Sequence, residues 1–78
     1  MNLLIDGTEL NFVKASRSHI DGKECVHVAV EGATAFLVES DNPSFVVETP
    51  VRNLTVFFDG VKRGEFDHLV AGVLEPAV

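Results

Sequence analysis

The stretch that decides the fold is ECVHVAVEGATAFLVES, residues 24–40. Its first half, Glu24–Glu31, alternates with a period of two, which is typical of a β-strand. The alternation divides this strand between two faces, with Val26, Val28 and Val30 on one and Cys25, His27 and Ala29 on the other. Glu31-Gly32 is a turn signal, and the β-branched and aromatic residues of Thr34–Ser40 favour a second strand. A connection this short joins antiparallel strands, because parallel strands need a long crossover.

Turn signals on both sides extend the same pattern. Upstream, Asp6-Gly7 separates the apolar run Leu3–Ile5 from Glu9–Lys14, which predicts a β-hairpin. Downstream, Asp41–Pro43 predicts a turn, because the residue before a proline is disfavoured in the helical conformation. Ser44–Glu48 then predicts a last short strand. We therefore expect an antiparallel β-meander of about five short strands.

The period of the sequence changes after these strands. Thr49 as N-cap and Pro50 at the first helical position predict that a helix starts near residue 50. The face of this helix that packs on the sheet is indicated by an apolar stripe at helical spacing, namely Leu54, Phe57, Phe58 and Val61. Gly64 predicts the end of the helix near residue 63. The predicted fold class is α+β, a small antiparallel sheet with one C-terminal helix, about 50–63, packed on it.

This pattern defines one domain over residues 1–67 and leaves a C-terminal tail, residues 68–78. The tail is apolar but has no clear period, so we expect it to be disordered or packed on a partner. A chain of 78 residues buries only roughly 60–65% of the surface that its unfolded form exposes. Cys25 is the only cysteine, so no internal disulfide can compensate. We therefore expect a homodimer, formed through an exposed strand edge or through the apolar tail.

The charge balance restricts the classes of partner. The chain has 12 acidic and 6 basic side chains and a formal net charge of −6. This sign repels nucleic-acid phosphates, so direct nucleic-acid binding is not expected. No apolar stretch approaches the ~20 residues of a membrane span, and no basic region of a signal peptide precedes the first apolar run. With its single unpaired cysteine, the chain is expected to be cytoplasmic.

The residues with reactive or metal-binding side chains do not form a recognisable catalytic set. Cys25 and His27 share one face of a strand, but a nucleophile and base pair also needs a group that orients the histidine and an oxyanion hole. A metal site needs further ligands at a recognised spacing, and the glycines do not form a phosphate-binding loop. We therefore expect no enzyme activity, no metal and no cofactor. Cys25 is expected to be buried and His27 to be partly exposed.

Two segments are candidates for binding. Lys14, Arg17 and Lys23 form a local basic patch on an acidic chain, and Ser16 and Ser18 lie between them. These hydroxyls and cations fit either a solvated loop or an anion site.

The second candidate segment is GVKRGEFD, residues 60–67. Gly64 would end the helix and Phe66 would fold back on it, while the cations complement the helix dipole. A glycine inside a helix costs ~1 kcal/mol relative to alanine, so at Gly60 we expect a close approach by a strand or a partner. With Phe57 of the apolar stripe added to these two segments, the candidate interaction residues are Lys14, Ser16, Arg17, Ser18, Phe57, Gly60, Lys62, Arg63, Glu65, Phe66 and Asp67.

Four motifs occur in order along the chain: FVKASRS (12–18), CVHVA (25–29), VESD (38–41) and GVKRGEFD (60–67). Together they resemble the small actinobacterial domain-of-unknown-function family that includes the developmental regulator BldB. The resemblance covers roughly residues 12–67. Phe12 and Leu54 stand where that family commonly has tryptophan, and His27 stands where it commonly has glutamate.

The resemblance implies a regulatory role. Members of that family are typically encoded beside helix-turn-helix regulators of the WhiJ type and are linked with them to development and antibiotic control. It therefore implies a non-enzymatic protein that binds such a regulator and modulates it, as a co-regulator or in an antitoxin-like manner. The residues themselves leave an alternative open, a small-ligand or anion sensor that uses the loop between Lys14 and Lys23.

Overall fold

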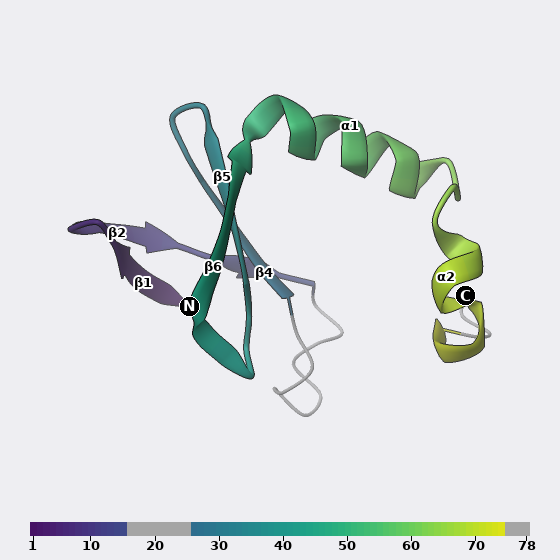
Figure 1. Ribbon diagram of the computed structural model, residues 1–78, viewed down its shortest axis with the longest axis horizontal. Coiled ribbons are helices and arrows are strands. Elements are labelled where there is room, and N and C mark those ends of the chain that lie inside the picture. The colour runs from purple at the N-terminus through teal and green to yellow at the C-terminus, as the bar shows by residue number, and fades with distance from the viewer. Residues whose placement is uncertain (16–25, 75–78) are drawn as a thin grey trace.

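The computed structural model describes residues 1–15 and 26–74. Within these residues the elements, in chain order, are β1 (Asn2–Ile5), β2 (Thr8–Asn11), β3 (Val13–Lys14), β4 (Val26–Glu31), β5 (Thr34–Glu39), β6 (Asn42–Pro50), α1 (Val51–Lys62) and α2 (Asp67–Leu74). β1 and β2 form a hairpin, and the other strands form an antiparallel sheet in the order β3-β4-β5-β6 (Figure 1). The predicted α+β class and the antiparallel meander are confirmed, with six strands instead of about five.

The additional strand comes from a bend at Phe12. The sequence predicts one strand over Glu9–Lys14, but this segment pairs with β1 up to Asn11 and with β4 from Val13 onward. The Phe12 side chain is only 2% exposed, and its backbone N–H donates a hydrogen bond to the Met1 carbonyl at 2.7 Å. Burial of this ring turns the strand from the hairpin into the sheet.

The hairpin forms where the sequence predicts it. Ile5 is paired with Thr8, so the loop has the two residues Asp6 and Gly7. Both have positive φ, +49° and +85° respectively, as a type I′ turn requires. This turn matches the twist of the strands and sets the register that brings Leu3 opposite Leu10.

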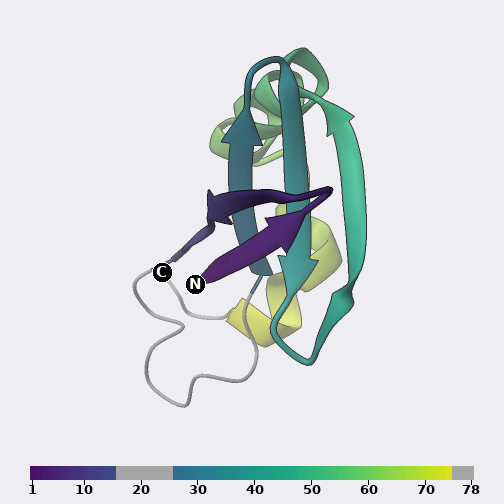
Figure 2. The same cartoon turned by 90° about the vertical axis from the view of Figure 1, so that its left-hand side faces the viewer.

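The hairpin covers one face of the four-stranded sheet, as the view from that side shows (Figure 2). The core between them contains Leu10, Phe12, Ala29, Phe36 and Val38, against which Leu3, Ile5 and Val46 pack. His27 lies on this covered face opposite Val38 and is only 6% exposed. The prediction that His27 is partly exposed is therefore wrong, because the period of two places it on the same face as the buried Ala29.

β6 is longer than the predicted strand Ser44–Glu48. The turn is formed at Ser40 and Asp41, and Asn42 and Pro43 already belong to the strand. Proline is tolerated there because β6 is an edge strand, where its missing N–H leaves no ladder partner unsatisfied. The register shifts between Val38 and Glu39, and this irregularity absorbs the extra residues of β6.

α1 begins directly at the end of β6. The N-cap residue is Pro50, with no side-chain cap, and Thr49 still belongs to the strand, so the prediction of Thr49 as N-cap is wrong. The first helical N–H, of Val51, donates to the carbonyl of Ala33 at 2.8 Å in the turn between β4 and β5. The Thr49 hydroxyl instead accepts a hydrogen bond from the Asn53 side chain at 3.2 Å. A backbone carbonyl of the turn between β4 and β5 thus accepts the hydrogen bond at the start of α1, where the sequence predicts the Thr49 side chain as acceptor.

The start of the predicted irregular tail, residues 68–74, is helical. α2 begins at Asp67, and an acidic residue in the first turn suits the helix dipole. The backbone N–H of Asp67 donates to the Gly64 carbonyl at 3.3 Å, and that of Leu69 donates to the Phe66 carbonyl at 3.0 Å. Eight residues make only about two turns, which is too short for a periodic pattern to be visible in the sequence.

The two helices form an arm, residues 51–74, which we call the helical arm. α1 contacts β5 and β6 near its start, where Leu54 is buried. Beyond that turn it runs away from the sheet, and α2 follows at its far end (Figure 1). In the view from the hairpin side, both helices lie behind the sheet (Figure 2). The predicted packing of the helix on the sheet is therefore confined to the first turns of α1.

Candidate interaction surface

Most of the predicted interaction residues meet where α1 ends and α2 begins, residues 60–67, which we call the elbow. The backbone N–H of Glu65 donates to the Gly60 carbonyl, and that of Gly64 donates to the Val61 carbonyl, both at 3.0 Å. Gly64 has φ +78°. This pair of hydrogen bonds around a left-handed glycine is the Schellman motif. The predicted helix end at Gly64 is confirmed.

The close approach predicted at Gly60 is made by Phe66 of the same chain. A Cβ atom on Gly60 would stand 2.9 Å from Cε2 of Phe66 and 3.0 Å from Oε1 of Glu65. The Phe66 ring also packs against Phe57, with 5.1 Å between ring centroids, and Phe57 lies 6.1 Å from Phe58. Phe66 thus folds back on the helix end, as the sequence predicts, and the elbow is a fixed turn with an aromatic cluster on it.

The charged side chains of the elbow remain in solvent. Lys62, Arg63, Glu65 and Asp67 are all exposed. The Arg63 Nε atom contacts the Asp59 carboxylate at 3.0 Å, with both side chains more than 60% exposed. Such an exposed i, i+4 pair contributes only ~0.3–0.5 kcal/mol. These charges therefore do little for the fold and are available to a partner.

The remaining predicted residues lie elsewhere. Lys14 is on β3, opposite His27 in the sheet, and does not belong to the elbow. Ser16, Arg17 and Ser18 lie outside the described residues, as do Lys23 and Cys25. Of the cations in the loop that would carry the anion-sensing alternative, only Lys14 lies within the described residues.

His27 is the buried polar side chain of the core, and its Nδ1 atom has no hydrogen-bond partner among the described residues. Burial lowers the pKa of His27 below its ordinary value, and the positive charges of the N-terminus and of Lys14 lower it further. The neutral form is therefore favoured in the folded chain. Across residues 1–15 and 26–74, His, Cys, Asp and Glu side chains do not gather in a group of three that could hold a metal ion.

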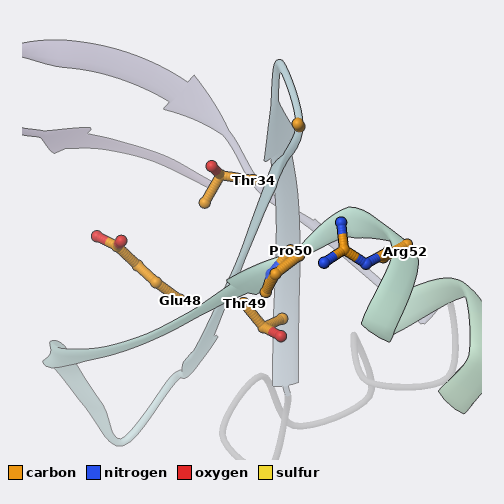
Figure 3. Close-up of a pocket in the computed structure, with 6 residues that line it drawn as sticks. Thr34, Glu48, Thr49, Pro50 and Arg52 are labelled. Carbon is orange, nitrogen blue, oxygen red and sulfur yellow. The ribbon is translucent and has the colours of Figure 1, made fainter.

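A hollow of ≈ 380 Å³ lies where β6 passes into α1 (Figure 3). It is lined by Ala33, Thr34, Glu48, Thr49, Pro50 and Arg52. All these residues are exposed or half-buried, and the Glu48 carboxylate points away from Arg52 (Figure 3). A ligand site normally converges buried polar groups on an enclosed apolar cavity, which this surface does not provide.

The sequence interpretation missed an exposed apolar surface on the other side of the sheet. Val13, Val28, Leu37 and Val47 are opposite one another across the four strands, and Val26 and Val30 flank them on β4. We call this surface, with the neighbouring Phe45, the open face. Val26, Val30 and Val47 are 58%, 55% and 51% exposed. A signal was present in the sequence, because Val26, Val28 and Val30 make one whole face of β4 apolar.

Comparison of the chain with protein-family models, with curated proteins and with solved structures gives no match. No helix in the described ranges is long and apolar enough to cross a membrane.

Proposed function

We propose that this chain is a non-enzymatic regulatory protein that binds a helix-turn-helix transcriptional regulator of the WhiJ type and modulates its binding to DNA. The observation that carries the proposal is the elbow. Its backbone is fixed by the Schellman hydrogen bonds and by the packing of Phe66 on Gly60, while its charged side chains are exposed. Aromatic residues are enriched at protein interfaces, and the elbow presents Phe66 on a rigid turn beside acidic side chains that a basic partner would complement.

Two further features support the proposal. The elbow coincides with GVKRGEFD, one of the motifs that resemble the family of the developmental regulator BldB. The net charge of −6 also complements a DNA-binding partner, whose DNA-contacting surface is basic. Binding of an acidic protein to that surface competes with DNA, which gives an antitoxin-like or co-regulator mechanism. The proposed location is the cytoplasm, where such regulators act.

Co-purification with the helix-turn-helix regulator encoded beside this protein tests the proposal. We expect a complex at micromolar concentration. Glu65→Lys reverses one charge of the elbow and should weaken the complex about tenfold or more, because charged pairs at an interface set its specificity. The matched control is Glu31→Lys, which makes the same charge change at an exposed position at the end of β4. Absence of a complex at micromolar concentration, or equal weakening by both variants, would contradict the proposal.

A further inference from the structure

His27 is a buried polar side chain between the hairpin and the four-stranded sheet. It is 6% exposed, and its Nδ1 atom lacks a hydrogen-bond partner among the described residues. In the register of the sheet its neighbours are Val38 on β5 and Lys14 on β3. A polar atom that is buried without a partner costs folding free energy, because water binds it once it is exposed. The hairpin therefore covers a group that is better solvated when the cover is removed.

The charges closest to His27 are positive. Besides its burial, two cations lower the pKa of His27, namely the N-terminal ammonium and Lys14. The N-terminal ammonium is held on the hairpin side, where it donates a hydrogen bond to the Phe12 carbonyl at 3.2 Å. A protonated imidazole in this position would be a third positive charge beside two others.

The acidic side chains of the neighbouring elements lie elsewhere. On the hairpin, Asp6 is in the turn, and the Glu9 carboxylate accepts a hydrogen bond from the exposed Asn2 side chain at 3.1 Å. On β5, Glu39 lines the hollow of the open face. On β6, Glu48 is exposed and lies two strands away from β4. Within the described residues a carboxylate thus does not face the imidazole, and protonation under the hairpin would bury an uncompensated cation.

The hairpin is bound to the sheet by side-chain packing. β1 and β2 form a separate two-stranded sheet, and pairing with β4 begins only at Val13. Leu3, Ile5 and Leu10 of the hairpin belong to the core cluster or pack against it. The strand pairing of the hairpin closes within residues 2–11, so the hairpin can separate from β4 without breaking the ladder of the larger sheet.

The larger sheet has support of its own. β4 pairs with β5 over Val26–Glu31, and β5 pairs with β6 along its length. α1 is joined to this sheet by the hydrogen bond from the Val51 N–H to the Ala33 carbonyl and by the buried Leu54. These contacts do not involve the hairpin, so its separation leaves them in place.

We infer that the hairpin is an acid-released cover: His27 takes up its proton when β1 and β2 separate from the sheet, while β4–β6 and α1 stay paired. The opening occurs on this side because the His27 side chain points toward the hairpin, and separation lets water reach the imidazole. Mild acid thereby uncovers the apolar side chains of Phe36 and Val38. The inference is independent of the proposed function, since the helices lie behind the sheet, away from the hairpin (Figure 2).

Native-state hydrogen exchange of the full chain, followed by NMR between pH 7 and pH 5, tests the inference. The Phe12 N–H, which donates to the Met1 carbonyl, reports separation of the hairpin, and the Leu37 N–H on the inner strand β5 reports unfolding of the sheet. After correction for intrinsic exchange rates, the protection factor of Phe12 at pH 7 should be at least about tenfold below that of Leu37. It should decrease by about tenfold or more from pH 7 to pH 5, because the open state binds more protons than the closed state.

The variant His27→Val assigns the effect to this imidazole, because the protection factor of Phe12 should then be the same at both pH values. His68→Gln, at an exposed position on α2, is the matched control. Equal protection of Phe12 and Leu37 in the wild type would mean that the hairpin separates only when the whole chain unfolds. Protection of Phe12 that does not change with pH would mean that His27 stays covered in the open state. Either result, or a pH dependence that persists in His27→Val, would overturn the inference.

Discussion

Gly60 lies against the aromatic ring of Phe66, and a Cβ atom on Gly60 would stand 2.9 Å from Cε2 of that ring. Only glycine fits this position, and the reason is packing, because Gly60 does not have a positive φ. The contact holds the turn between α1 and α2 together with the Schellman hydrogen bonds. The geometry of the helical arm therefore depends on one small residue and one ring.

Replacement of Gly60 by alanine tests this relationship. Alanine favours a helix by ~1 kcal/mol over glycine, but the displaced Phe66 ring loses its contact with Phe57, so we expect a net loss of stability. In a Phe66→Ala background the ring is absent, and the same replacement should then stabilise the chain by ~1 kcal/mol. Chemical denaturation of the four chains measures this change of sign. Stabilisation by Gly60→Ala in both backgrounds would exclude the packing role.

Gly64 is required for a different reason, its left-handed backbone at φ +78°. Gly64→Ala should cost ~1–2 kcal/mol, because a Cβ is strained in this region. Gly64→Asn should cost less than Gly64→Ala, since asparagine visits the left-handed region more readily. The midpoints of thermal unfolding give the order directly, and an equal loss for both replacements would contradict the Schellman assignment.

Arg63 should affect binding more than stability. Its pair with Asp59 is exposed and contributes only ~0.3–0.5 kcal/mol, so Arg63→Ala should leave the unfolding free energy almost unchanged. If the elbow contacts the basic surface of the regulator, the same replacement removes a repelled cation and should strengthen the complex, by up to about tenfold. Denaturation and titration of one variant preparation measure both effects. A large loss of stability would show that Arg63 has a structural role that its exposure does not reveal.

His27 makes the stability of the fold depend on pH. The folded state lowers the pKa of His27 below 6.5 and so binds fewer protons than the unfolded state. The contribution of the neutral imidazole is complete above about pH 6.5 and is lost as the pH falls from there toward the folded-state pKa. We therefore expect the unfolding free energy to decrease between pH 6.5 and pH 5.

His27→Val isolates this effect. Valine suits a buried strand position and has no polar atom that needs a hydrogen bond. The unfolding free energy of the variant should therefore not decrease as the pH falls, and at pH 5 it should exceed that of the wild type. His68→Gln removes an exposed imidazole on α2 and serves as the matched control. A decrease that persists in His27→Val would assign the pH dependence to another group.

Local signals in the sequence predicted most elements of the fold. Asp6-Gly7, the alternation in β4 and the glycine at residue 64 each act through neighbouring residues, so their structural outcome is visible in the sequence. The predictions are wrong where a residue distant in the sequence determines the local structure. Thr49 does not cap α1, because the Ala33 carbonyl in another turn binds the first helical N–H. The single predicted strand over Glu9–Lys14 is divided, because burial of Phe12 redirects it.

The features of the candidate site were likewise predicted only where neighbouring residues determine them. The motif at residues 60–67 predicted the helix end at Gly64, which is formed by neighbouring residues. It also predicted a close approach at Gly60, but by a strand or a partner, whereas Phe66 of the same segment makes it. The open face was not predicted, because alternation identifies two faces of β4 but does not say which one the hairpin covers. The hairpin covers the face of His27 and leaves Val26 and Val30 exposed.

The central claim, that this protein modulates a helix-turn-helix regulator, is tested most directly on DNA. The affinity of the adjacently encoded regulator for its operator can be measured by fluorescence anisotropy while this protein is added at micromolar concentration. The account predicts that the wild type shifts the apparent dissociation constant of the operator complex at least tenfold and that Glu65→Lys does not. An operator affinity that stays unchanged at saturating concentrations of the wild-type protein would contradict it.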